Sequence, residues 1–168
     1  MNFRILYCLC LIRHSRREII HFDVTESPTS EWVVQQLREA FSDSTEDRYL
    51  IFDRDAKFSS DVQGFLDSAG VSAIRTNYRS PCQNGVAETW VRSFRDDLLD
   101  RVIVAHEGHV NRLARDYLHY YHADRTHDGL NKDTRQRRTK SIRNPGKRQV
   151  SLSRLGGLHH RYSWAKAA

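Results

Sequence analysis

Two acidic residues, Asp53 and Glu88, hold the positions in this sequence that could support catalysis. Asp53 directly follows the short apolar run 49–52, and Glu88 stands in the first turns of a helix expected to begin after residue 84. Carboxylates on a strand end and on a helix are rigid oxygen ligands of the kind that Mg²⁺ prefers. Two such metals can stabilise both oxygens of a phosphoryl displacement. The same two acids also suit a solvated strand end and a helix N-terminal charge, so spacing alone leaves both interpretations open.

The elements that position these acids follow from the hydrophobic pattern. We expect a strand over 49–52, a helix over 59–69 that stops at Gly70, a strand over 71–76, a polar loop over 77–83 and a helix with Asn84 as its N-cap. Arg95 lies seven residues after Glu88. Seven residues make two helical turns, so Arg95 and Glu88 share one helix face, about 10 Å apart along the axis.

The residues before this region predict a hairpin and a helix. Residues 3–13 are apolar almost throughout, which is typical of a strand buried on both faces, and 18–25 return as a second strand. The helix that follows begins near residue 30, with Thr29 or Ser30 as its cap. Cys8 and Cys10 share one face of the first strand, and we expect them to pack in the core rather than to bind metal.

The residues after the Glu88 helix predict another helix over 106–121. His106 and His109, and likewise His119 and His122, are three residues apart and could share a helix face, but no Cys or acid completes a tetrahedral zinc site. The chain has three cysteines, an odd number without a disulfide framework, so we expect a reducing, cytoplasmic setting. No stretch approaches the roughly 20 apolar residues of a membrane span.

Positive charge is concentrated at the end of the chain. Residues 131–168 hold eleven Lys and Arg residues against one acid, Asp133, whereas the net charge of the whole chain is only +6. Residues 159–164 add aromatic rings beside basic residues, a composition that can follow a nucleic-acid backbone and stack on bases. A disordered, solubilising tail is the alternative interpretation of the same composition, and the sequence leaves both open.

Three motifs carry a family resemblance. Residues 53–58 read D-R-D-A-K-F, residues 80–88 read S-P-C-Q-N-G-V-A-E, and residues 121–130 read Y-H-A-D-R-T-H-D-G-L. In this order they resemble the catalytic core of DDE-type integrases and bacterial insertion-sequence transposases, the retroviral-integrase-like superfamily. The third motif departs from the family pattern at His122, which replaces Asn, and at Thr126, which replaces Pro.

The resemblance implies a fold, an activity and a set of site residues. The fold class is α/β, a ribonuclease H-like mixed sheet flanked by helices, with a catalytic core over 1–130 and a basic C-terminal tail over 131–168. The activity is DNA integration and transposition by metal-dependent polynucleotidyl transfer, with Mg²⁺ or Mn²⁺ as cofactor. The partner is DNA, both element ends and target, and we expect the chain to form a homo-oligomer. We expect no membrane association, and a location in a bacterial-type cytoplasm, at the nucleoid when DNA is bound. Asp53 and Glu88 would be catalytic metal ligands; the DNA contacts would be Arg95, Lys57, Arg125, Arg137 and Arg138.

One part of the family pattern has no counterpart. The family's first catalytic acid lies on a central strand that precedes the strand resembled by residues 3–12, and neither Asp23 nor Asp55 matches its position. We therefore expect a chain that lacks the first strand and is inactive as a transferase. A non-catalytic remnant that binds DNA or interferes with an intact transposase is the main alternative. A ribonuclease H-type nuclease is disfavoured by the motif at 80–88 and by the missing acid.

Overall fold

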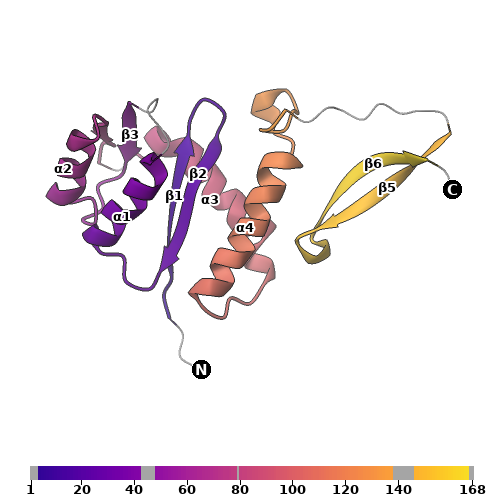
Figure 1. The fold of residues 1–168 in the computed structure, drawn as a ribbon, viewed down its shortest axis with the longest axis horizontal. Helices are drawn as coiled ribbons and strands as arrows, with labels where there is room; N and C mark the ends of the chain where they lie inside the picture. The colour runs from indigo at the N-terminus through magenta and orange to yellow at the C-terminus, as the bar shows by residue number, and fades with distance from the viewer. Residues whose placement is uncertain (1–3, 43–47, 79, 138–145, 167–168) are drawn as a thin grey trace. The chain divides into compact units, whose positions relative to one another are not determined.

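The computed structural model describes residues 4–42, 48–78, 80–137 and 146–166 (Figure 1). The elements are β1 (Tyr7–Arg13), β2 (Glu18–Thr25), α1 (Ser30–Phe41), β3 (Tyr49–Phe52), α2 (Ser60–Ser68), β4 (Ser72–Arg75), η1 (Pro81–Asn84), α3 (Gly85–Asp97), η2 (Leu99–Arg101), α4 (Glu107–Ala123), η3 (Asp128–Leu130), β5 (Lys147–Arg154), η4 (Leu155–Gly157) and β6 (His159–Lys166). Most of the elements expected from the sequence are present within a few residues of their expected bounds.

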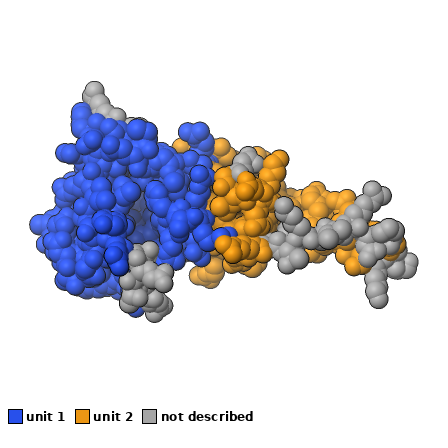
Figure 2. Space-filling view, turned by 90° about the horizontal axis from the view of Figure 1, so that it is seen from above, with its two compact units in different colours: residues 1–92 blue, residues 93–168 orange. Residues whose placement is uncertain are grey.

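The chain divides into two compact units, Met1–Arg92 and Ser93–Ala168, which are coloured separately in Figure 2. The boundary falls inside α3, whereas the sequence placed the end of the core at residue 130. The first unit holds the two strand pairs of the N-terminal half. The second holds the end of α3, α4 and the C-terminal hairpin.

The strands form three separate two-stranded sheets. β1 and β2 pair antiparallel, β3 and β4 pair parallel, and β5 and β6 pair antiparallel. A parallel pair needs a crossover connection, and α2 supplies it between β3 and β4. Within the described residues no backbone ladder joins β1–β2 to β3–β4, which fits the expectation of a ribonuclease H-like sheet without its central strand.

Helix α1 provides the core of the first unit. Its buried residues Val33 and Leu37 pack in one apolar cluster with Leu11 of β1, Phe52 of β3 and Leu66 of α2. The cluster contains residues from both strand pairs, although their backbones are not joined. At the start of the helix the Thr29 hydroxyl accepts a hydrogen bond from the Trp32 amide at 3.2 Å, which settles the choice of cap.

The first strand corrects one prediction. β1 begins at Tyr7 rather than at residue 3, and Leu11 is its one fully buried residue; Tyr7 and Cys8 are exposed. The expected burial on both faces is therefore wrong for most of the strand. The physical reason is that an apolar run is buried on both faces only where other parts of the chain cover both, and the described apolar cluster packs against Leu9 and Leu11 of β1.

The environment of Cys10 predicts an unreactive thiol. Cys10 lies opposite Phe22 in the sheet, and the Phe22 ring meets Trp90 at 5.8 Å. Burial, with a smaller contribution from Cys8, raises the pKa of the Cys10 thiol to about 12. Only the thiolate reacts with a disulfide reagent, so at pH 8 about one Cys10 in ten thousand is reactive at any moment.

We therefore expect Ellman's reagent at pH 8 to modify exposed Cys82 rapidly and Cys10 only as the chain unfolds. A Cys10→Ser variant should lose the slowest of the three phases and keep the fastest. Modification of Cys10 at the rate of Cys82 would contradict this assignment.

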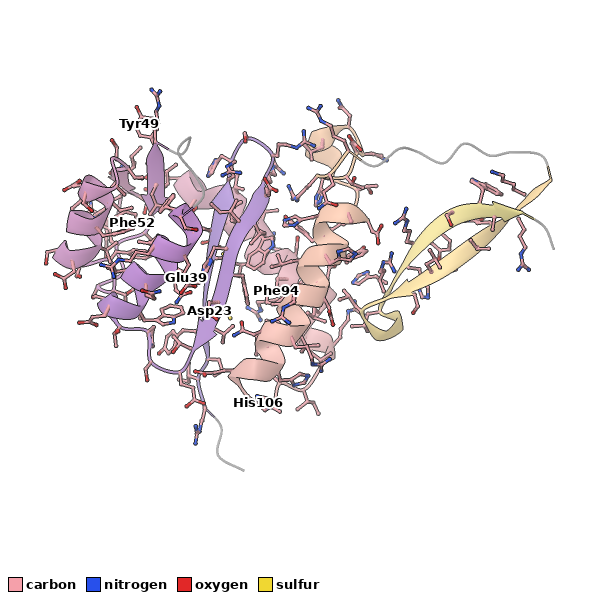
Figure 3. The ribbon with its side chains drawn as sticks, viewed as in Figure 1. Asp23, Glu39, Tyr49, Phe52, Phe94 and His106 are labelled. Atoms are coloured by element: carbon pink, nitrogen blue, oxygen red, sulfur yellow. The ribbon has the colours of Figure 1, made fainter. Side chains whose placement is uncertain are left out.

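The second unit has an aromatic core between α3 and α4. Phe94 of α3, labelled in Figure 3, and Tyr117 of α4 are buried, and their ring centroids are 5.1 Å apart. α4 begins where His106 accepts a hydrogen bond from the His109 amide at 3.2 Å, so these two histidines serve the helix end. In the portion of the chain that the structure describes, no helix combines the length and apolarity needed to cross a bilayer.

The basic C-terminal segment is folded over residues 146–166. β5 and β6 form an antiparallel hairpin whose turn contains Gly156 (φ 64°) and Gly157 (φ 99°), both in the left-handed region that favours glycine. The interpretation of this stretch as a disordered tail is therefore wrong. The register that closes the hairpin pairs Arg154 with His159.

Candidate metal and nucleic-acid site

Asp53 lies at the carboxyl end of the parallel pair β3–β4. This edge is closed by two neighbours in the same motif: the Arg54 Nε donates to the Thr76 carbonyl at 3.0 Å, and the Phe58 ring stacks on Phe52 at 4.7 Å. Arg54 thus ties the loop after β3 to the end of β4, and Phe58 ties it to the core. The D-R-x-x-x-F pattern therefore has a structural role, which is to hold the backbone around Asp53.

The loop after Asp53 is ordered by carboxylates. Exposed Asp53 accepts a hydrogen bond from the Asp55 amide at 3.2 Å, and Asp55 accepts one from the Lys57 amide at 3.0 Å. The Lys57 Nζ also lies 3.0 Å from Asp55 Oδ2 and 5.2 Å from the centroid of the Tyr7 ring. The Lys57 backbone N–H and then its ammonium lower the pKa of Asp55. Lys57, a predicted DNA contact, thus has local partners.

Glu88 is presented by the start of α3. The Asn77 amide donates to the Gln83 side-chain oxygen at 2.7 Å, which holds η1 beside the end of β4. α3 then begins at Gly85, directly after the predicted cap Asn84, and exposed Glu88 stands in its first turn. The predicted strand-end acid and helix acid therefore occupy the elements that the sequence assigned to them.

These two acids do not complete a metal site of the expected kind. The family pattern calls for three acids, and among the described residues no group of three or more His, Cys, Asp and Glu side chains is arranged to hold a metal ion. Asp55, the nearest acid in sequence to Asp53, is hydrogen-bonded to Lys57. The residues present thus offer two exposed carboxylates and do not fit a closed Mg²⁺ or Mn²⁺ centre.

Two of the predicted DNA-contacting residues, Arg95 and Arg137, lie outside this loop and are exposed. Arg95 lies on α3 two turns after Glu88; its side chain is 65% exposed, and its Nε is 3.9 Å from Asp100 Oδ1. Such a long surface ion pair contributes little and leaves the guanidinium available to a ligand. Arg137 is exposed after η3, whereas Arg138 lies outside the described residues.

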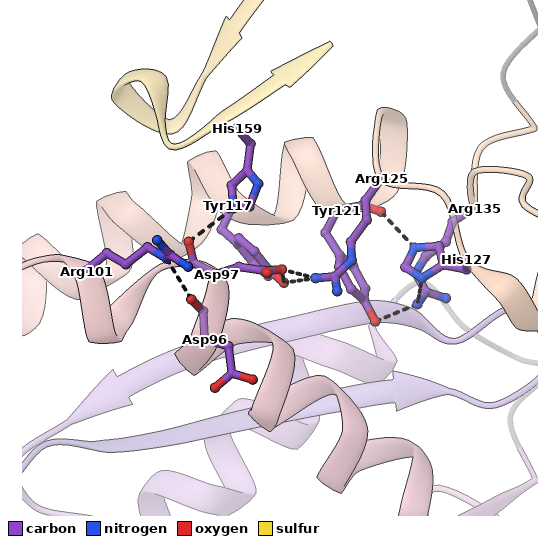
Figure 4. Close-up of polar contacts among 9 residues, drawn as sticks. All are labelled: Asp96, Asp97, Arg101, Tyr117, Tyr121, Arg125, His127, Arg135 and His159. Atoms are coloured by element: carbon purple, nitrogen blue, oxygen red, sulfur yellow. Dashed lines mark hydrogen bonds and ion pairs between the residues drawn. The ribbon is translucent and has the colours of Figure 1, made fainter. Parts of the chain in front are cut away.

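Arg125, by contrast, is held in an internal network (Figure 4). Its guanidinium donates to the Tyr117 hydroxyl at 2.8 Å and pairs with the Asp97 carboxylate, and the Tyr117 hydroxyl donates to Asp97 at 2.9 Å. The guanidinium also lies 5.7 Å from the centroid of the Tyr121 ring. These contacts favour a packing role for Arg125 over the DNA contact that the resemblance implies.

Sequence reasoning missed Arg135, whose side chain is central to the second half of this network. Arg135 is only 5% exposed; it donates to the Tyr121 hydroxyl at 2.5 Å, lies 3.3 Å from His127 Nδ1 and stacks over the Tyr121 ring at 4.2 Å. Neighbouring Thr134 is buried as well. The sequence offers no signal that singles out Arg135 from the other cations of the basic segment.

Comparison with known proteins bears on these motifs directly. Residues 69–134 match the integrase core domain family, a stretch that contains Glu88 and the motif at 121–130. No curated protein sequence matches the chain.

Solved structures resemble the chain in fold. The catalytic core domain of BIV integrase aligns with a TM-score of 0.56 and 15% identity, over 73% of this chain and 78% of that one. A chain of the simian T-cell lymphotropic virus intasome aligns with a TM-score of 0.58 and 12% identity, over 96% of this chain and 61% of that one. The chain therefore has the ribonuclease H-like fold of integrase catalytic cores, and its residues 69–134 match the integrase core domain family.

Proposed function

We propose that this chain acts on DNA as a transposase- or integrase-type core protein of the polynucleotidyl transferase class. The observation that carries the proposal is the placement of Asp53 at the end of β3 and Glu88 at the start of α3, each inside a motif of that family. We assign Asp53 and Glu88 as the ligands of a single, weakly bound Mg²⁺ or Mn²⁺, and DNA contacts to Arg95, Lys57 and Arg137, with Arg138 a further candidate. As a DNA-acting core the chain would work in a bacterial-type cytoplasm and as a homo-oligomer.

A second candidate function is non-catalytic DNA binding, with interference in an intact transposase as its consequence. It is favoured by the absence of a three-acid group among the residues that the structure describes. In that case the basic residues of the C-terminal segment supply the affinity. Arg135, Arg154 and Arg161 have internal partners, so the phosphate contacts fall to the remaining cations there.

Duplex DNA binding and metal dependence separate the two candidates. For either, we expect binding that falls about 10³-fold between 50 and 200 mM salt if six phosphates are neutralised. The catalytic candidate requires in addition that nicking or strand transfer appears with Mn²⁺ or Mg²⁺ and vanishes with a chelator. Binding that is unchanged by chelator, with no strand cleavage, would support the non-catalytic candidate.

Glu88→Gln and Asp53→Asn test the ligand assignment without relying on turnover. Each should abolish Mn²⁺ binding measured by calorimetry and any strand cleavage, because each removes one of two carboxylate ligands. The matched control is Asp67→Asn, an exposed acid whose hydrogen bond from Gln63 can persist in the variant. Mn²⁺ binding equal in all three variants would refute the assignment.

A further inference from the structure

One face of the C-terminal hairpin contacts α4 and the end of α3, and it is called the committed face below. The Arg154 Nε lies 2.6 Å from Asp124 Oδ2 and the Arg161 Nη1 lies 3.1 Å from Asp124 Oδ1. His159 on the same face contacts the Asp97 carbonyl at 3.1 Å and stacks on Tyr120 at 4.8 Å. The cross-strand register confirms that these residues share a face, because Arg154 pairs with His159 and Arg161 pairs with Leu152.

The opposite face carries a row of aromatic rings. Side chains alternate along a strand, so every second residue of β6 from position 160 points away from the committed face. These residues are His160, Tyr162 and Trp164. Tyr162 is 56% exposed, and its ring centroid lies 6.4 Å from that of His160. His160 and Tyr162 are exposed and Trp164 is half-buried, so the row forms a stacking surface centred on Tyr162.

The facing strand leaves these rings accessible. Across the ladder the partners of His160, Tyr162 and Trp164 are Ser153, Ser151 and Gln149, two small residues and one amide. None of them is large enough to cover a ring, and all three can donate or accept hydrogen bonds. The rings therefore have polar groups beside them and no apolar neighbour across the strand pair, unlike the residues of the committed face.

The charge around this face is positive. Exposed Lys147 stands on this face at the open end of the hairpin, exposed Arg148 follows it on the committed face, and the sequence contains no Asp or Glu after Asp133. Ligands with π-faces and negative charge suit such a surface, since each base can stack on a ring while the phosphates meet the cations. Rings at alternate positions of a strand are about 6.8 Å apart, a spacing suited to separated bases rather than to bases stacked within a duplex.

We propose that this outward face of β5–β6 binds single-stranded nucleic acid, with unpaired bases stacked on Tyr162 and its two neighbouring rings. The proposal uses neither Asp53 nor Glu88 and does not rest on the proposed catalytic or metal-binding function. It would give the chain affinity for frayed or nicked DNA that its duplex contacts do not provide.

The test measures binding of fluorescein-labelled dT15 and of a 15-base-pair duplex to the full chain by fluorescence anisotropy, in chelator. We expect tighter binding of dT15 and a loss of about 5- to 100-fold in Tyr162→Ala, in line with one base stacked on one ring. Tyr162→Phe should bind within about twofold of the unchanged chain, because the ring, and not the hydroxyl, does the stacking. Far-UV circular dichroism checks that each variant keeps the hairpin.

Two controls make the result specific. Leu152→Ala alters an exposed residue of the committed face, and Asp67→Asn alters an exposed acid of α2; both should leave dT15 affinity within about twofold. An equal loss in Leu152→Ala, or equal affinity for dT15 and duplex in all variants, would overturn the proposal. So would a self-association that Tyr162→Ala abolishes in a chain that does not bind dT15, which would make this face a contact between copies.

Discussion

Replacing Tyr117 by alanine is expected to lower the free energy of unfolding of the second unit by about 3–5 kcal/mol, the usual cost of truncating a buried aromatic residue. Tyr117 has no exposed surface; its ring packs against Phe94, and its hydroxyl lies between Asp97 and Arg125. The truncation therefore opens a cavity and also removes the hydroxyl between an acid and a cation. Urea unfolding followed by far-UV circular dichroism measures the loss.

The conservative variant separates these two contributions. Tyr117→Phe keeps the ring and removes only the hydroxyl, so we expect a loss of about 1–3 kcal/mol, in the range of a hydrogen bond to a charged group. Tyr78→Ala is the matched surface control; its ring is 74% exposed, and the change should cost less than about 1 kcal/mol. Equal stability of Tyr117→Ala and Tyr78→Ala would show that the aromatic core does not hold this unit together.

Tyr117 also gives the second unit a dependence on alkaline pH. Burial raises the pKa of its hydroxyl above the ordinary value, and the Arg125 guanidinium offsets only part of this effect. A raised folded-state pKa contributes stability that is complete below the unfolded pKa of about 10 and is lost as the pH rises above it. The stability advantage over Tyr117→Phe should therefore shrink above about pH 10, which a series of urea transitions would reveal.

The elements around the candidate site could be predicted because local signals there agree with each other. Ser59 and Gly70 bracket α2 as cap and stop, and Gly70 adopts the positive φ that its position requires. Thr29 does the same for the start of α1. In these places the residue that fixes the backbone lies within a few positions of the helix end, so the local sequence is enough to predict where the helix begins or ends.

Burial and long-range pairing could not be predicted in the same way. The apolar run that contains β1 has the same sequence pattern whether or not the rest of the chain covers both of its faces, and only the structure shows that Tyr7 and Cys8 are exposed. In the sequence Arg135 is one of eleven cations of the basic C-terminal segment, and only the structure shows that it contacts Tyr121 and His127. Charge counted along a sequence does not distinguish a cation with an internal partner from one that is free to meet DNA.

The attachment of the hairpin makes this distinction testable. Asp124 is 1% exposed at its side chain and lies between Arg154 and Arg161, which are 27% and 34% exposed. Replacing both arginines by glutamine leaves a buried carboxylate without its cations. Removing a partner from a fully buried pair costs about 3–5 kcal/mol, and partial solvent access to these arginines reduces our expectation to about 2–3 kcal/mol.

The corresponding triple variant provides the control. Adding Asp124→Asn to Arg154→Gln and Arg161→Gln removes the stranded charge, and we expect it to recover at least half of the lost stability, because replacing an entire buried ion group is often close to neutral. The difference between the triple variant and the sum of its parts gives the coupling energy of the group. If both arginines can be replaced without a loss of stability, Asp124 does not hold the hairpin, and Arg154 and Arg161 are also available to bind a nucleic acid. If the loss and its recovery both appear, these two charges attach the hairpin to α4, and the affinity for bases rests on the aromatic face.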